Sequence, residues 1–192
     1  MEDRNQYYCQ LEGCLEKAVF HFVEVRARRS VRVSHFCGAH FSSEFGYPAN
    51  SIVSSADWPK PFGLIEVELD YLLFDDRRAD AIAQFSNRDV GTIFRVSLGY
   101  VDSSILYNYV KEGANRHLFI HQAMSRCIQE LGAHVVHVVM DRSDDLFFCR
   151  IELEVARQQR SLDCGIADGY AIAIITERPF YISQKALENY VK

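Results

Sequence analysis

No apolar run in this 192-residue sequence approaches the ~20 residues that a membrane-spanning helix needs, so we expect no membrane span. Basic residues are also scarce, since 21 of them against 26 acidic residues give a net charge of −5. A protein that binds nucleic acid non-specifically normally presents a large basic surface. We therefore expect any contact with DNA or RNA to be local, or to be assisted by a metal ion.

Several familiar motifs are missing as well. The sequence has no Gly-rich phosphate loop and no nucleophile elbow. It also has no secretory signal peptide ahead of its first cysteine, Cys9. We expect a reducing, cytoplasmic setting, in which the six cysteines do not form a disulfide framework.

The sequence does contain enough apolar material for a core. It is 48% hydrophobic and 12% aromatic, which excludes global disorder. Its length allows one small module and one domain of ordinary size. Gly46, Pro48, Pro59 and Pro61 punctuate a stretch that is typical of a linker. We therefore predict a module at residues 1–45, a linker at 46–61 and a larger domain at 62–192.

Four residues near the start have the spacing of metal ligands. Cys9 and Cys14 form a C-x4-C pair, and after a spacer of 22 residues Cys37 and His40 form a C-x2-H pair. Three thiolates and an imidazole can close a tetrahedral shell around Zn²⁺, with no position left open for catalysis. The segment between the pairs is too short for its own core, so metal binding would supply most of its folding free energy. The spacing predicts a structural zinc site.

Residues 7–41 also resemble a small zinc module found at the ends of various bacterial proteins. The alternative is that these cysteines are unrelated small apolar residues of the kind usually buried in a core.

The remaining pattern indicates alternating strands and helices. Strands are predicted at residues 65–71, 79–85, 92–98, 135–140, 147–155, 159–162 and 179–182. Helices are predicted at residues 102–111, 117–131 and 166–176, followed by a C-terminal helix. Asp102 or Ser103 would cap the first helix and Ser183 the last. We predict an α+β fold with helices packed on a mostly antiparallel sheet, preceded by the zinc-binding hairpin.

Two phrases of the larger domain are similar to the bifunctional nuclease domain family. HQAMSRCIQELGAHVVHVV, beginning at His121, resembles the family's Thr-His-Asp-Leu…Glu-Leu-Gly-Ala…Val-x-x-Val stretch. LDCGIADGYAIAIITERPFYI, beginning at Leu162, resembles its Ile-Asp-x-Arg-Pro-Ser-Asp-Ala-Ile-Ala-Leu-Ala…Pro-Ile-x-Val signature. A shorter match is Leu98-Gly99…Asp102. The family's Arg, Pro and Ser are Gly165, Ile166 and Ala167 in this sequence.

The resemblance implies a metal-assisted nuclease that acts on DNA or RNA. His121 would be the general acid or base. Asp102, Asp163 and Asp168 would hold Mg²⁺ or Mn²⁺, or position water. Arg116 would stand in for the family's phosphate-binding arginine.

Each of these residues also has a structural interpretation. Asp102, Asp163 and Asp168 lie near helix starts, where acidic residues cap N–H groups and suit the helix dipole. His121 lies beside an apolar helix face formed by Ile120, Met124, Cys127, Ile128 and Leu131. The rival hypothesis is therefore a catalytically degenerate binding or regulatory protein whose zinc hairpin contacts a partner. Exposed sheet edges favour a homo-oligomer in either case.

Overall fold

The computed structural model describes residues 10, 14–16, 18, 20–26, 30–37, 63–75, 80–87, 92–112, 119–144 and 146–188. The strands are β1 (Phe20–Arg26), β2 (Ser30–Phe36), β3 (Leu64–Glu66), β4 (Glu68–Asp75), β5 (Asp80–Asn87), β6 (Thr92–Gly99), β7 (Ala133–Ser143), β8 (Leu146–Val155), β9 (Gln158–Cys164) and β10 (Phe180–Ser183). The helices are α2 (Tyr100–Glu112), α3 (Phe119–Glu130), α4 (Ile166–Ile175) and α5 (Gln184–Glu188). No described helix is long and apolar enough to cross a membrane.

The strands form two five-stranded sheets. The first sheet is antiparallel, in the order β2-β1-β4-β5-β6. The second sheet has the order β3-β10-β7-β8-β9 and is mixed, because β10 runs parallel to β7. The predicted α+β class is confirmed.

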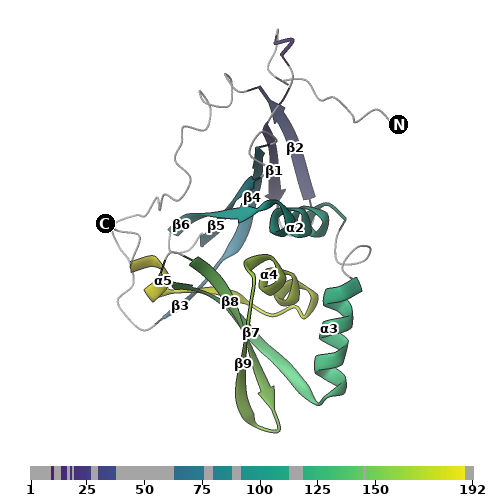
Figure 1. The fold of residues 1–192 in the computed structure, drawn as a ribbon, viewed down its shortest axis with the longest axis vertical. Helices are drawn as coiled ribbons and strands as arrows, with labels where there is room; N and C mark the ends of the chain where they lie inside the picture. Colours follow the sequence, from purple (N-terminus) through teal and green to yellow (C-terminus); the bar gives the residue numbers. More distant parts are fainter. Residues whose placement is uncertain are drawn as a thin grey trace.

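Helix α4 lies in the middle of the molecule, with α2 and α3 beside it (Figure 1). It is apolar on almost every side, which is typical of a buried helix. One core cluster joins Phe85 and Phe94 of the first sheet, Ile172 of α4 and Ile151 of β8. The Tyr170 hydroxyl accepts a hydrogen bond from the Leu69 N–H at 3.3 Å, which ties α4 to the first sheet. Side chains carried by α4 are therefore attached to the centre of the core.

The hairpin β1–β2 extends the first sheet. Strand β1 pairs with β4 as well as with β2, and Val23 of β1 is fully buried opposite Leu72 of β4. The expectation of a hairpin that folds apart from the larger domain is therefore wrong in this respect. The predicted linker at 46–61 lies outside the described residues, and the boundaries at 45 and 62 stay a prediction.

The strand predicted at residues 65–71 is in fact two strands in two sheets. Strand β3 pairs with β10, and the Val67 N–H donates to the Phe180 carbonyl at 2.9 Å before β4 enters the first sheet. A bulge between Leu69 and Tyr71 then changes which side chains face the core. The alternation of apolar and polar residues continues where the chain passes from the second sheet to the first. The sequence pattern could therefore not reveal this change of sheet.

Helix α3 is rotated relative to its predicted apolar face. Ile120 and Leu131 are each 80% exposed, and Cys127 is also exposed. His121 and Ser125 are buried together with Ile128 instead. The predicted face is confirmed for Met124 and Ile128, which pack on the core, and wrong for the other three residues, because tertiary contacts turn a histidine and a serine inward.

The ends of α2 and β7 differ from the predictions, whereas the predicted cap of α5 is confirmed. Helix α2 begins at Tyr100, so neither Asp102 nor Ser103 is its cap, and the Ser103 hydroxyl donates to the Tyr100 carbonyl at 2.9 Å. Strand β7 runs beyond the predicted end at residue 140, and Asp141 is a buried residue of this strand that pairs with Arg150 at 3.1 Å. Ser183 does cap α5, since its hydroxyl accepts the Ala186 N–H at 3.1 Å.

Candidate active site at the start of helix α4

The chain enters α4 from β9 through Gly165. Gly165 is the N-cap residue, and it makes no side-chain capping hydrogen bond to the first turn of the helix. Asp168 lies in that first turn, where its charge suits the helix dipole as the structural interpretation predicted, but it is not the N-cap residue. Its Oδ1 atom is bonded to another helix instead.

Asp168 is bonded to His121 of α3. The His121 Nε2 and Asp168 Oδ1 atoms are 2.8 Å apart, and the two side chains are 8% and 43% exposed. The imidazole is thus buried, whereas the carboxylate reaches solvent. The His121 Nδ1 atom is buried and has no hydrogen-bond partner among the residues that the structure describes. A buried ring fixed through one nitrogen holds its carboxylate partner in a single orientation.

Asp102 of α2 also lies close to Gly165. A Cβ atom built on Gly165 would be 3.3 Å from Asp168 Oδ2 and 3.8 Å from Asp102 Oδ1. Burial raises the pKa of the Asp102 carboxyl, and the negative charge of Asp168 raises it further. Three of the predicted catalytic residues, which are far apart in the sequence, are therefore brought together around one glycine.

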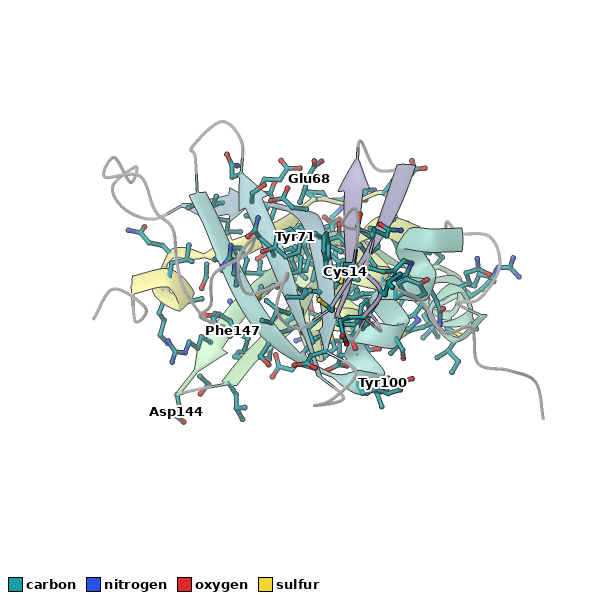
Figure 2. All side chains as sticks on the ribbon, turned by 90° about the horizontal axis from the view of Figure 1, so that it is seen from above. Cys14, Glu68, Tyr71, Tyr100, Asp144 and Phe147 are labelled. Carbon is teal, nitrogen blue, oxygen red and sulfur yellow. The ribbon has the colours of Figure 1, made fainter. Side chains whose placement is uncertain are left out.

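Helix α2 exposes two apolar side chains at its start, since Tyr100 and Val101 are 64% and 69% exposed. The Tyr100 side chain points outward from the edge of the molecule (Figure 2).

The structure separates Asp163 from this group. Asp163 is exposed and pairs in register with Arg150 of β8, one position before the pair of Cys164 with Cys149. Cys149 contacts the Ile166 carbonyl of α4, and neighbouring residues of a strand point to opposite faces. Asp163 therefore faces away from α4, and it does not join His121 and Asp168. Arg116 lies outside the described residues.

The two cysteines next to the site are not nucleophiles. Burial raises the pKa of the Cys149 thiol well above its usual range, with a further contribution from Cys164. Burial, with Asp168 and Asp163, raises the pKa of Cys164 to about 12. Both thiols stay protonated near neutral pH, and a protonated thiol is neither a nucleophile nor a metal ligand.

The described part of the chain holds no group of three or more His, Cys, Asp or Glu side chains arranged for a metal ion. Two carboxylates nevertheless face the space beside Gly165. Mg²⁺ is commonly bound by one or two carboxylates together with waters and substrate phosphates, so the donor set fits such an ion.

At the other end of the chain, the structure brings two of the four predicted zinc ligands together. The sulfur atoms of Cys14 and Cys37 are 3.9 Å apart, nearly twice the ~2.05 Å of a disulfide bond. Two sulfurs bound to one tetrahedral zinc at ~2.3 Å would be ~3.8 Å apart. Cys37 is buried and Cys14 is half-buried. Cys9 and His40 lie outside the described residues.

Sequence reasoning missed two glycines that shape the site. Gly165 leaves open the space beside the two carboxylates, and Gly169 lets α4 approach β8, since its Cβ would lie 2.5 Å from Cys149 Cβ. The only signal was Gly169, because glycine is unfavourable in a helix interior, whereas it is common at an N-cap such as Gly165. Neither position has a positive φ that would explain it.

Comparison with known proteins does not assign this chain to a family. The sequence matches no protein-family model, and no curated protein matches it. The resemblance to bifunctional nucleases therefore stays a prediction, and the geometry around Gly165 is the main guide to the function of the chain.

Proposed function

We propose that this protein hydrolyses phosphodiester bonds of DNA or RNA at the site formed by His121, Asp168 and Asp102. The observation that carries the proposal is the 2.8 Å contact between His121 and Asp168. Helix α3 buries this histidine while Ile120, and Leu131 in the turn after the helix, are exposed, although burial of a polar ring is costly and burial of apolar side chains is favourable. Local rules are broken in this way most often at functional sites.

The N-terminus of α4 supports a phosphate ligand. The first N–H groups of a helix carry a partial positive charge, which favours a phosphate oxygen. Here no side-chain cap occupies the first turn, and Gly165 adds no side chain in front of it. This end of α4 can supply part of the positive charge for which the family uses an arginine.

The carboxylates would provide the rest of the chemistry. Asp168 and Asp102 would hold Mg²⁺ or Mn²⁺, which would neutralise charge on the phosphoryl oxygens. Burial, and then the negative charge of Asp168, raises the pKa of Asp102, and a bound cation would favour the charged form of this carboxyl. His121 would keep Asp168 oriented through Oδ1 and would take up, through that contact, the proton that Asp168 removes from the attacking water, while Oδ2 faces the space beside Gly165.

We also propose a structural zinc ion bound by Cys9, Cys14, Cys37 and His40. The separation of the Cys14 and Cys37 sulfurs supports it, because it agrees with the edge of a tetrahedral zinc–thiolate shell. The zinc would attach the segment around Cys14 to the end of β2, and thus to the first sheet. Its role would be to fold this end of the chain.

A nuclease assay with and without Mg²⁺ or Mn²⁺ tests the catalytic proposal. We expect His121→Ala and Asp168→Asn each to lower hydrolysis of single- or double-stranded substrates by about 10²- to 10⁴-fold, the usual range for a lost acid–base group. His134→Ala removes an exposed histidine of β7, and Asp163→Asn removes a carboxylate on the far face, so both should keep wild-type activity.

Equal activity in all five proteins would reveal a contaminant and contradict the proposal. Complete inactivity of a folded, zinc-loaded wild type with every substrate would favour the binding or regulatory alternative. That alternative draws its support from one feature of the site: among the described residues, no Arg or Lys is bonded to Asp102 or Asp168.

A further inference from the structure

The hairpin formed by β8 and β9 has two faces of opposite charge. Residues that lie opposite each other on two antiparallel strands point to the same face, and Cys149, which contacts the Ile166 carbonyl, identifies the face toward α4. The side chains on that face are those of Cys149, Ile151, Leu153, Val155, Gln158, Arg160, Leu162 and Cys164. Arg160 is the one charged residue among them. The far face carries the carboxylates of Glu152, Glu154 and Asp163.

The face toward α4 is open to solvent along β9. Strand β9 forms the edge of the described second sheet, and the hairpin extends beyond α4 (Figure 1). Arg160 is exposed, and Leu162 is 45% exposed although it is apolar. The helices therefore leave this part of the sheet uncovered, and a ligand can approach it.

The positive charge of Arg160 is not neutralised by a carboxylate in the described part of the chain, where the ion pairs involve other residues. Its Nη2 atom donates to Gln158 Oε1 at 3.0 Å, and this neutral partner restricts the side chain without cancelling its charge. A guanidinium has five N–H donors in a planar fork that matches the oxygens of a phosphate. Arg160 thus keeps donors available for an anionic ligand.

This open face leads from Arg160 to the candidate active site. Cys164 lies on the same face and precedes Gly165, whose Cβ position is 3.3 Å from Asp168 Oδ2. Four residues of a strand, from Cys164 to Arg160, cover about 13 Å. A nucleic-acid strand that has one phosphate at the site can extend along β9 and reach Arg160 with another phosphate, whereas a dinucleotide has a single phosphodiester and cannot. The carboxylates of the far face repel the same strand, so the charges favour the side toward α4.

We infer that Arg160 is a substrate-binding residue, which contacts a backbone phosphate a few nucleotides away from the bond that is cleaved. The inference rests on the proposed function, since the strand extends from the His121–Asp168 site. It names the substrate class of that site: nucleic-acid chains of several nucleotides in preference to dinucleotides. Because a phosphate contact carries no sequence information, the preference is for length and not for base sequence.

Binding of a fluorescein-labelled single-stranded DNA of about 20 nucleotides to the full-length, zinc-loaded chain tests the inference, measured by fluorescence anisotropy from ~50 to ~200 mM NaCl without Mg²⁺ or Mn²⁺. We expect Arg160→Ala to weaken binding about tenfold, as for a lost hydrogen bond to a charged group. The slope of log Kd against log salt should become smaller by about 0.7, the value for one phosphate contact on a single strand. Arg160→Lys keeps the charge and should keep the slope.

Arg178→Ala is the matched control, because it removes the same charge from an exposed residue between α4 and β10. It should bind the DNA as the wild type does, and so should Glu154→Gln on the far face. In hydrolysis with Mn²⁺, Arg160→Ala should raise KM for the long DNA about tenfold at unchanged kcat, and it should cleave a dinucleotide at the wild-type rate.

Three results would overturn the inference. They are equal DNA affinity in Arg160→Ala and the wild type, an equal loss in Arg178→Ala, and a lower rate of dinucleotide cleavage in a folded Arg160→Ala protein. A wild type that binds no DNA would overturn it as well. A wild type that binds DNA through Arg160 but cleaves nothing would overturn the catalytic proposal alone, so the two failures are distinguishable.

Discussion

The hairpin end of the chain and the α4 region both join polar side chains that are distant in sequence, but they are stabilised in different ways. Cys14 and Cys37 meet beside a two-stranded hairpin, whereas His121 and Asp168 meet on helices that pack on the main core. In α4 the residues Ile166, Ala167 and Tyr170 to Ala173 are all buried. In the second region apolar burial holds a costly polar pair in place, whereas in the first region the proposed zinc ion would supply part of the folding free energy.

Removal of zinc should have the largest effect, and it should be confined to the hairpin region. We expect about one zinc per chain, lost in Cys14→Ser and in Cys37→Ser, because three remaining ligands no longer close the shell. Loss of the ion should raise amide exchange in β1 and β2, where part of the folding free energy would come from metal binding. Amides of β7 and β8 should exchange as before. Elemental analysis and hydrogen exchange measure the two effects.

Cys127→Ser is the matched control for that experiment, because Cys127 is exposed on α3, far from the hairpin in sequence. It should keep both the zinc and the protection of β1. Undiminished zinc in Cys14→Ser would contradict the ligand assignment. Equal loss of protection in β1 and β8 would instead show that the two regions unfold together through the pairing of β1 with β4.

The α4 region should respond to packing instead. In Gly169→Ala the new Cβ would lie 2.5 Å from Cys149 Cβ and 3.2 Å from Val138 Cγ1, so the helix must move away from the sheet. We expect a loss of about 1–3 kcal/mol in the free energy of unfolding, as for other overpacked cores. Urea unfolding at constant zinc occupancy measures it, with Gly63→Ala as a control that should differ little. An unchanged midpoint in Gly169→Ala would mean that α4 does not pack closely against β8.

The same comparison explains what the sequence could predict. Local patterns predicted most strands and helices, and the Ser183 cap was confirmed, because alternation, helical spacing and capping are properties of neighbouring residues. The pairing of β1 with β4 and the crossing at Val67 were missed, since they depend on contacts between distant segments. A pattern within one strand contains no information on which sheet it joins.

The candidate site was predicted in part for the same reason. Residue type and resemblance pointed to His121, Asp168 and Asp102, and the structure does bring them together. They could not show that Asp163 faces away, because that depends on the register of β9 with β8. They pointed to an apolar face of α3 that included Ile120, whereas packing against α4 selected the face with His121. Site geometry thus came from tertiary contacts that the sequence pattern left undetermined.

The smallest expected effect distinguishes a functional carboxylate pair from a structural one. The pKa of Asp102 is raised above its ordinary value of 3.8, so between these two values the folded chain binds more protons than the unfolded chain. Stability should therefore fall as the pH rises through that window, and stay lower above it. Asp102→Asn removes this dependence and should raise the free energy of unfolding at pH 7 by about a few tenths of a kcal/mol, since the carboxyl is only partly buried and solvent screens its charge.

Thermal unfolding between pH 3 and 7, without added Mg²⁺ or Mn²⁺, measures this difference. Asp144→Asn, at an exposed turn position with a φ of 54° that Asn tolerates, is the control and should follow the wild type. A structural Asp102 would make the Asn variant less stable at pH 7, because its contacts would be lost. Higher stability combined with lower nuclease activity would instead mean that the chain keeps an unfavourable charge beside Asp168 for the sake of the reaction.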